Sequence, residues 1–409
     1  MAVSADSRSA VTGMTWVTVG AITANAGGYL LYVLASRWLG VSGYSEFASL
    51  LAAQLVLCVP ALALQTVVAR EVVRGQQLEA LRRLTLRCAG LVAVLAALLV
   101  PVLSVILHAG VLATAGALLA APVLVVLSGE QGLLQGSGRF RELAVLLALA
   151  GVGRIAPAVV ALGLGAGSAV ALIASAVGSF AVTVGARRYV GSPDAVTVAI
   201  TTTVRSVLMA SQVQLALIAL SSVDVMIARI VLEGESASRY AAGAVVTKVA
   251  FWLPQAVGVV LYPRMAHPQE SARALRSALA ILGGLGAVTV AAAAVGAPLL
   301  PFIVGDAYAP VQGLLWAFAA NGALLTILQG ALLAAIAGER TRLALVAWLG
   351  LAVEIAVMLA VARTVGELIA TAVSTALVTT TVVCALALAG TRSGVAPSGS
   401  RGIAALRRT

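Results

Sequence analysis

The sequence predicts an all-α polytopic membrane protein, and three observations lead to this fold class: composition, hydropathy and the length of the apolar segments. Hydrophobic residues make up 61% of the 409 residues, charged residues make up only 10%, and the mean hydropathy is +1.07. A soluble domain carries about 25% charged residues. A helix needs about 20 apolar residues to cross a hydrocarbon core that is about 30 Å thick. Apolar windows of this length cover most of the chain.

Twelve membrane spans are predicted, with short polar connections between them. The first apolar segment is longer than the apolar core of a signal peptide, and no small-residue cleavage site follows it, so we interpret it as a retained first span. The polar connections are too short to bury a core of their own, so the function is expected within the bilayer. In chain order, the predicted spans are 15–36, 46–69, 88–108, 111–129, 143–163, 166–186, 206–231, 240–262, 277–298, 311–337, 343–362 and 367–390.

The basic residues are distributed unevenly over the connections. If the N-terminus is cytoplasmic and the spans alternate, 20 of the 26 basic residues fall on the cytoplasmic side. Two more, Arg154 and Lys248, fall within spans, and four lie at the outer ends. The positive-inside rule then predicts a multi-pass protein of the cytoplasmic membrane with both termini in the cytoplasm. It also accounts for the net charge of +11. Because no basic stripe is interleaved with aromatic residues, nucleic-acid binding is not expected.

The two halves of the chain resemble each other. Gly138–Arg141 opens the fifth span and Gly338–Arg342 opens the eleventh; Arg154-Ile-Ala and Glu354-Ile-Ala follow at similar distances. An alternative is that two basic loops simply look alike, but the offset equals the expected half-length. Six spans per copy preserve the orientation, which predicts two six-helix lobes related by a pseudo-two-fold axis along the membrane normal. Two such lobes around a central cleft suit alternating-access transport.

The expected organisation follows from this repeat. Both lobes are flanked by basic segments that are too short to fold independently. The expected units are a cytoplasmic N-terminal segment 1–14, a first lobe 15–190, a cytoplasmic linker 191–205, a second lobe 206–390 and a basic cytoplasmic tail 391–409.

Two opposite charges are expected at one depth near the outer surface. A charge in the hydrocarbon costs about 2.5–3.5 kcal/mol on insertion scales and suggests function. Asp224 lies eight residues before the predicted outer turn 232–240 and Lys248 lies eight residues after it, so each is about 12 Å deep. They are expected to pair. The pair is either structural or functional, with Lys248 binding a diphosphate and Asp224 exchanging a proton or Na⁺.

The other two intramembrane charges, Arg154 and Glu354, are repeat equivalents near the midplane. Each lies about 18 Å from the cytoplasmic surface. The Arg154 guanidinium matches phosphate oxygens bidentately, so it is the preferred candidate for binding the substrate; the alternative is that it binds carbonyl groups of broken neighbouring helices. Glu354 is expected to order a coupling cation or sugar hydroxyls.

Uncharged polar residues and prolines give weaker predictions. Amides within spans suit a wet cavity that binds sugar hydroxyls, although interhelical hydrogen bonding is their more common role. The candidate amides for substrate binding are Asn25, Gln212, Gln214 and Asn321. Pro60 and Pro254 lie in the middle of the equivalent second and eighth spans, where proline tends to kink a helix. These kinks are candidates for gating; the alternative is a static shape.

Several motifs, taken in order, resemble polysaccharide flippases of the MOP superfamily, the Wzx type. They are Leu34–Tyr44, Ser222–Asp224, Arg239–Gly243, Leu261–Met265 and Leu299–Tyr308. The resemblance implies twelve to fourteen helices in two lobes. It also implies export of a polyprenyl-diphosphate-linked oligosaccharide to the outer leaflet, with membrane lipid, a polysaccharide polymerase and glycosyltransferases as partners. The peptidoglycan-precursor branch usually has fourteen spans, so it fits this chain less well.

Two other function classes remain open. One is a cation-coupled exporter of drugs or small solutes from the same superfamily, and the other is a membrane-embedded sugar-lipid polymerase or acyltransferase. Short outer loops disfavour an enzyme, and His108 and His267 lie at opposite membrane faces. The only lysine follows Thr247, so there is no Walker A motif. The three cysteines show no metal-ligand spacing. No cofactor and no metal are therefore expected.

Overall fold

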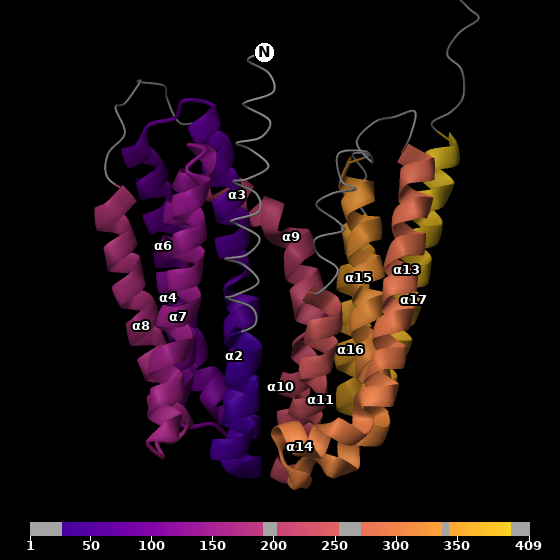
Figure 1. Cartoon of the computed structure of the whole chain (residues 1–409). Coiled ribbons are helices and arrows are strands. Elements are labelled where there is room, and N and C mark those ends of the chain that lie inside the picture. The colour runs from indigo at the N-terminus through magenta and orange to yellow at the C-terminus, as the bar shows by residue number, and fades with distance from the viewer. Residues whose placement is uncertain (1–26, 191–202, 253–270, 338–342, 394–409) are drawn as a thin grey trace, which may run out of the picture.

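Helices make up nearly all of the described chain. The computed structural model describes residues 27–190, 203–252, 271–337 and 343–393, and these residues contain no β-strand. Figure 1 shows two upright helix bundles, one formed by the first half of the chain and the other by the second.

The first bundle begins with helical residues 27–38. It continues with α2 (Gly40–Leu57), α3 (Val59–Val73), α4 (Leu78–Ile106), α5 (Val111–Leu118), α6 (Ala120–Gly136), α7 (Phe140–Gly163) and α8 (Ser168–Val190). The second comprises α9 (Val204–Leu220), α10 (Val223–Val231), α11 (Gly234–Trp252), α13 (Ser271–Gly296), η1 (Ala297–Leu299), α14 (Leu300–Val304), η2 (Asp306–Leu314), α15 (Leu315–Ala337), α16 (Ala344–Val361) and α17 (Val365–Ser393).

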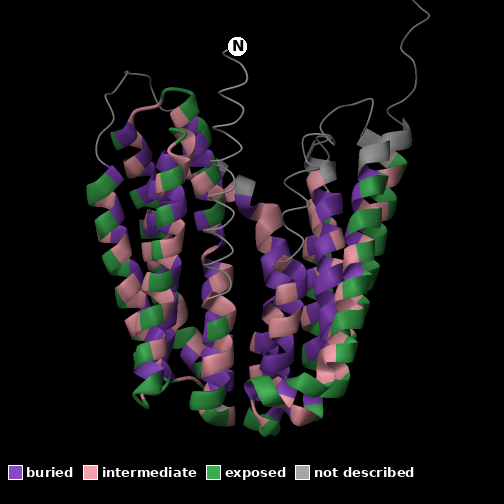
Figure 2. Ribbon diagram, in the orientation of Figure 1, coloured by how far each residue is buried: buried purple, intermediate pink, exposed green. Residues whose placement is uncertain are grey.

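The predicted membrane spans are confirmed over the described residues. Ten helical segments there are long and apolar enough to cross a membrane, and they correspond to predicted spans two to seven and nine to twelve. Predicted spans one and eight lie partly outside the described residues. Figure 2 shows exposed residues on the outward faces of the bundles, and many are large and apolar, such as Val94, Leu98 and Val105 on α4. Apolar residues that face outward over a whole bundle indicate lipid contact rather than contact with water.

The order of helix neighbours repeats between the bundles. In the first, α3 packs on α6, α6 on α8, and α7 on α8; in the second, α11 packs on α15, α15 on α17, and α16 on α17. These pairs occupy the same places in two successive sets of six spans. The predicted fold class, an all-α polytopic protein of two related lobes, is therefore confirmed.

Several helices extend further than the hydropathy predicted. The fourth span was expected to end at residue 129, but α6 continues to Gly136 and buries Glu130. Arg82 reaches Glu130 from α4 with two hydrogen bonds of 3.0 and 2.9 Å, and Arg187 of α8 lies 3.7 Å from it. The carboxylate is neutralised across helices, which is what allows a charged residue inside the lobe.

Two predicted spans are broken. The second divides at Cys58 into α2 and α3, with Pro60 in the first turn of α3. The helix is thus interrupted two residues before Pro60, whereas Pro254 lies outside the described residues. The seventh span divides at Ser221 and Ser222 into α9 and α10, and this break was not predicted. It falls directly before Asp224.

Glycines allow close approach of helices inside each lobe. A Cβ atom on Gly178 of α8 would collide with the carbonyl oxygen of Gly153 on α7. A Cβ on Gly132 of α6 would lie 2.6 Å from the carbonyl oxygen of Gln65 on α3. Such backbone contact is how small residues pack membrane helices. On α13, a Cβ on Gly286 would lie 2.9 Å from the Ala323 Cβ of α15, whereas Gly283 and Gly284 face open space.

The two lobes meet at one end, called the closed end here, where α2 lies beside α10 and α11. Arg229 of α10 donates to the carbonyl oxygens of Leu107 (2.9 Å) and His108 (3.1 Å) and to Ser45 Oγ (3.0 Å) in the first lobe. Arg37 donates to the carbonyl oxygens of Ile303 (2.7 Å) and Phe302 in the second. Toward the opposite end, called the open end, the bundles separate (Figure 1). The open end carries most of the described basic residues.

Candidate functional site

A cavity of about 380 Å³ lies between the first lobe and α11 of the second lobe. Its apolar wall comes from α2, α3, α6 and α7. Its polar lining consists of the side chains of Tyr29, Tyr32, Ser128, Gln131, Arg154 and Lys248. Arg154 and Lys248 are the only charged residues among the described residues that line this cavity.

Arg154 occupies the cavity wall formed by α7. Its side chain is half-buried, and its Nε is buried without a hydrogen-bond partner. No acidic residue in the described part of the chain forms an ion pair with it. A buried N–H donor without a partner costs about 1–3 kcal/mol, so a ligand that accepts its hydrogen bond gains that energy on binding. The Arg154 guanidinium is therefore available to donate a hydrogen bond to an anionic ligand.

Lys248 reaches the cavity from α11 of the other lobe. Its side chain is buried, and Nζ lies 5.8 Å from the centroid of the Tyr32 ring. The Tyr29 hydroxyl donates to the carbonyl oxygen of Lys248 at 3.3 Å. These contacts hold the lysine against the first lobe without neutralising its charge. The cavity therefore presents two cations, one from each lobe.

Asp224 and Lys248 do not form the predicted ion pair, because no nitrogen–oxygen distance between them is within 4.0 Å, although their charges still attract each other. Asp224 instead accepts hydrogen bonds from the Tyr240 hydroxyl (2.9 Å) and the Val225 N–H (2.8 Å).

The length of the outer turn explains this difference. The predicted turn 232–240 is in fact only residues 232 and 233, because α10 ends at Val231 and α11 begins at Gly234. Tyr240 and Asp224 are therefore both about 10 Å from this turn, whereas Lys248 is about 21 Å from it and near the midplane.

Glu354, like Asp224, is buried inside the second lobe and does not line the cavity. It projects from α16, which packs on α10, the helix of Asp224, and it is 3% exposed. No hydrogen bond or ion pair joins Glu354 to another described residue. The structure thus separates the four intramembrane charges into a cationic cavity and a carboxylate pair inside the second lobe.

The remaining candidate residues are dispersed. Gln212 on α9 turns back on its own helix and donates to the Leu208 carbonyl oxygen at 3.2 Å. Gln214 is half-buried, and neither glutamine lines the cavity. Asn321 on α15 is buried, with Nδ2 unpartnered, and also lies outside the cavity lining. Asn25 is outside the described residues.

Four polar cavity residues had not been predicted: Tyr29, Tyr32, Ser128 and Gln131. Ser128 and Gln131 lie three residues apart on α6, so both fall on one helix face. This spacing was the available signal, but the predicted span ended at residue 129 and left Gln131 in a loop. The two tyrosines looked like ordinary apolar span residues.

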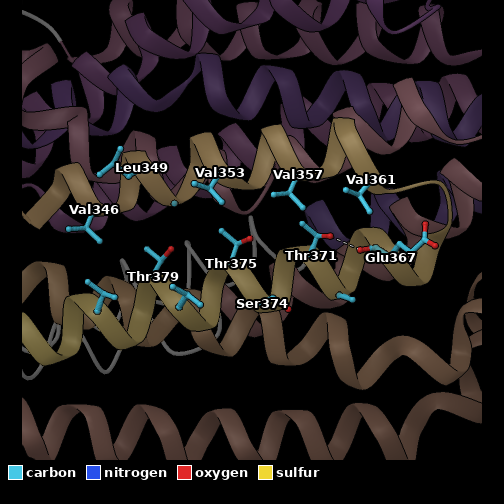
Figure 3. Close-up of a pocket in the computed structure, with 14 residues that line it drawn as sticks. Val346, Leu349, Val353, Val357, Val361, Glu367, Thr371, Ser374, Thr375 and Thr379 are labelled. Carbon is cyan, nitrogen blue, oxygen red and sulfur yellow. Dashed lines mark hydrogen bonds between the residues drawn. The ribbon is translucent and has the colours of Figure 1, made fainter.

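A second cavity, of about 640 Å³, lies between α16 and α17 (Figure 3). Valines of α16 face a row of hydroxyl side chains on α17, including Thr371, Thr375 and Thr379. Its only charged lining residue among those described is Glu367, which accepts hydrogen bonds from the N–H groups of Arg363 (2.7 Å) and Thr364 (3.1 Å). No cation lines this groove among the described residues, so it fits an apolar chain better than an anionic substrate.

These features define a two-lobed polytopic membrane protein with a cationic cavity between its lobes. No protein-family profile and no curated protein sequence matches the chain, but its fold matches solved transporters. A multidrug-resistance MATE family transporter of the MOP superfamily, in an inward-facing conformation, has a TM-score of 0.68 at 11% identity, covering 91% of this chain and 96% of that chain.

Two further structures share the fold. A eukaryotic MATE transporter has a TM-score of 0.59 at 13% identity, covering 94% of this chain and 98% of that one. A MOP superfamily transporter from Pyrococcus furiosus has a TM-score of 0.56 at 13% identity, covering 94% of this chain and 96% of that chain. Reversed polarity of that protein's binding pocket suggests a different function for it. At such identities the likeness establishes only that this chain shares the fold of these transporters; it does not extend to the flippase branch.

Proposed function

We propose that this chain is an alternating-access transporter of the cytoplasmic membrane that exports an amphiphilic organic anion. The shared fold supports transport, since the matched structures are transporters. The open end carries the basic connections, so the positive-inside rule places it toward the cytoplasm. The cavity would then load from inside, as in the inward-facing relative.

The observation that carries the choice of substrate is the charge of the cavity. Arg154 and Lys248 line it from opposite lobes, and no described acidic residue pairs with either of them or joins them in the lining. An exporter of organic cations needs acidic groups where these two residues stand. Two cations on opposite walls also give an anion a contact in each lobe, so that its binding is sensitive to how the lobes are arranged.

Two kinds of anion fit. The matched structures favour a drug or small-solute exporter, so a soluble organic anion is the first candidate. The motif resemblance and the free guanidinium favour a second candidate, a polyprenyl-diphosphate-linked oligosaccharide, for which Arg154 would bind the diphosphate. In that case glycosyltransferases and a polysaccharide polymerase would act before and after this protein.

The carboxylate pair suits ion coupling. Asp224 and Glu354 are both buried in the second lobe, on the packed helices α10 and α16, and Asp224 lies two residues after the break between α9 and α10. Two adjacent carboxylates favour uptake of a cation or a proton, because either relieves their repulsion. Discontinuous helices are where transporters commonly bind coupling ions. We assign H⁺ or Na⁺ coupling to this pair, separate from the substrate cavity.

The test is transport by the purified full chain in proteoliposomes, with Arg154→Ala, Arg154→Lys and the wild type compared. A charge-assisted hydrogen bond contributes about 1.5–3 kcal/mol, so Arg154→Ala should reduce anion transport about tenfold or more. Arg154→Lys retains the charge but not the bidentate donors, so it should give an intermediate rate. Arg363→Ala is the control, because Arg363 hydrogen-bonds only to nearby carbonyls of α16.

The substrates separate the two candidates. A fluorescent organic anion, an organic cation of similar size and a lipid-linked oligosaccharide are offered in parallel, and the lipid is followed by leaflet-resolved labelling. Transport of the soluble anion alone supports the exporter, and leaflet transfer of the lipid alone supports the flippase. Transport of the organic cation but not the anion by the wild type, or anion transport at the wild-type rate by a well-folded Arg154→Ala protein, would overturn the anionic assignment.

A further inference from the structure

A third cavity opens on the outer wall of the first lobe, between α7 and α8 at the open end. It measures about 690 Å³. Its walls are apolar and face outward: Val145 and Leu149 of α7 are 54% and 52% exposed, and Tyr189 of α8 is 67% exposed. Gly185 lies on the α8 wall, and a Cβ atom there would meet nothing within 4 Å. The absent side chain leaves room for an inserted chain.

The acidic residue at the mouth of this groove, Glu142, already has a basic partner. Glu142 is bound by Arg139, whose Nε donates to it at 2.9 Å. Arg139 also donates to the Val190 carbonyl oxygen at 3.2 Å and lies 5.9 Å from the Tyr189 ring centroid. Among the described lining residues, Glu142 is the acidic one, and its charge is therefore neutralised by Arg139.

Two arginines at this end of α7 and α8 remain available. Arg141 lines the groove, whereas Arg188 does not line it but lies in the last turn of α8, one residue before the lining residue Tyr189. Both are exposed, and neither forms an ion pair with a described residue. The α16–α17 groove of Figure 3 is similar in volume but has no such cation. Charge, not size, distinguishes the two grooves.

We propose that the α7–α8 groove binds an anionic phospholipid of the surrounding bilayer. An acyl chain lies between Val145, Leu149 and Gly185, and Arg141 and Arg188 bind the phosphate. The bilayer is the source because the groove opens on the lipid-facing wall at the basic end of the lobe. Basic pockets between membrane helices bind such headgroups, with about 1 kcal/mol from each basic residue. This site is separate from the inter-lobe cavity and does not depend on the transported substrate.

Lipid binding to the purified full chain tests this proposal, with native mass spectrometry as the readout. The probes are phosphatidylglycerol and phosphatidylcholine with identical acyl chains. The wild type should prefer phosphatidylglycerol. Arg141→Gln should weaken its binding about fivefold, and the double change with Arg188→Gln about 25-fold. Gly185→Leu fills the groove and should weaken both lipids.

Matched controls decide between a site and diffuse attraction. Arg87→Gln removes an exposed arginine from α4 at the same end, and Gly90→Leu adds a side chain where a Cβ meets nothing within 4 Å. Both should bind lipid like the wild type. Equal losses for Arg87→Gln and Arg141→Gln, or no preference for the anionic lipid, would overturn the proposal. A changed oligomeric state with unchanged lipid binding in Gly185→Leu would assign the groove to a second copy of the chain. If Gly185→Leu does not fold, the surface changes Arg141→Gln and Arg87→Gln still decide the outcome.

Discussion

Asp224 illustrates how a buried charge is held in this protein. It is completely buried at the start of α10, where it accepts one hydrogen bond from a backbone N–H and one from the Tyr240 hydroxyl. Burying a carboxylate without such donors costs several kcal/mol. Tyr240 is itself fully buried, and its ring packs edge-on against Phe318 at 5.1 Å between centroids. The ring fixes the hydroxyl that solvates Asp224.

A double-mutant cycle tests this pairing. A hydrogen bond to a charged group contributes about 1.5–3 kcal/mol, so the coupling energy of Asp224→Asn with Tyr240→Phe should fall in that range. The coupling of Asp224→Asn with Lys248→Gln should be smaller, since those groups lie further apart. The measurement is the free energy of unfolding in detergent. Tyr44→Phe is the control, because Tyr44 is equally buried but its hydroxyl makes no hydrogen bond to a described residue. If the coupling energy of Asp224 with Lys248 were larger than that of Asp224 with Tyr240, the predicted direct ion pair would be supported instead.

At the scale of elements, both helix breaks lie next to functional candidates. Cys58, at the α2–α3 break, lines the inter-lobe cavity, and the α9–α10 break precedes Asp224. A broken helix leaves backbone groups free to move or to bind ligands, and within a membrane this is tolerated only where protein or a cavity surrounds them. The two helix breaks are therefore candidates for hinges, one beside the inter-lobe cavity and one beside Asp224.

Pro60 allows the first hinge to be tested. It has no N–H, so alanine at this position restores a donor and favours a continuous helix through the break. We expect Pro60→Ala to lower the transport rate while the amount of folded protein stays the same. Pro101→Ala is the control, because α4 continues through Pro101 without a break. Equal transport rates for Pro60→Ala and the wild type would assign Pro60 to shape alone.

At the scale of the molecule, two arginines hydrogen-bond the lobes to each other at the closed end. Arg229 makes three inter-lobe hydrogen bonds and Arg37 makes two. Edge-on contact of the Tyr44 and Tyr308 rings, 5.9 Å between centroids, adds to the same junction. Arg37 belongs to the motif Leu34–Tyr44, which links that motif to closure between lobes. Opening at this end requires these bonds to break.

Arg229→Ala should therefore shift the equilibrium toward opening at the closed end, by about tenfold or more if one charge-assisted hydrogen bond is lost. The distance between spin labels at Leu164 and Val361 measures this opening. Both residues are exposed at the closed end, one in each lobe. The three native cysteines are first replaced by serine. Arg363→Ala, whose arginine bonds within its own lobe, should leave the distance distribution unchanged. An unchanged distribution in Arg229→Ala would show that the arginine does not hold the lobes together.

The orientation in the membrane has an independent test. Reporter fusions after residues 80, 195 and 395 should all report the cytoplasm, because the positive-inside rule places these basic segments there. The same result places the open end toward the cytoplasm. A periplasmic signal from any of the three fusions would contradict the topology and the inward-open assignment.

Hydropathy and charge counts predicted the membrane spans, and the internal repeat predicted the two lobes. This is so because the bilayer acts on each segment locally, through the cost of burying polar groups. The same local rule failed at Glu130, where hydropathy ended the helix too early because partners on α4 and α8 neutralise the charge. It also failed to show the break before Asp224, which no proline marks.

Only the tertiary structure decided how the charges are grouped. A two-residue turn, rather than a nine-residue one, moved Lys248 to the midplane and left Asp224 level with Tyr240. Tyr29, Tyr32 and Gln131 became cavity residues through the packing of helices that are distant in sequence. The α7–α8 groove likewise exists because Gly185 faces outward beside α7. Depth along one helix can be counted from a sequence, but the neighbour that each side chain faces depends on the rotation and packing of whole helices.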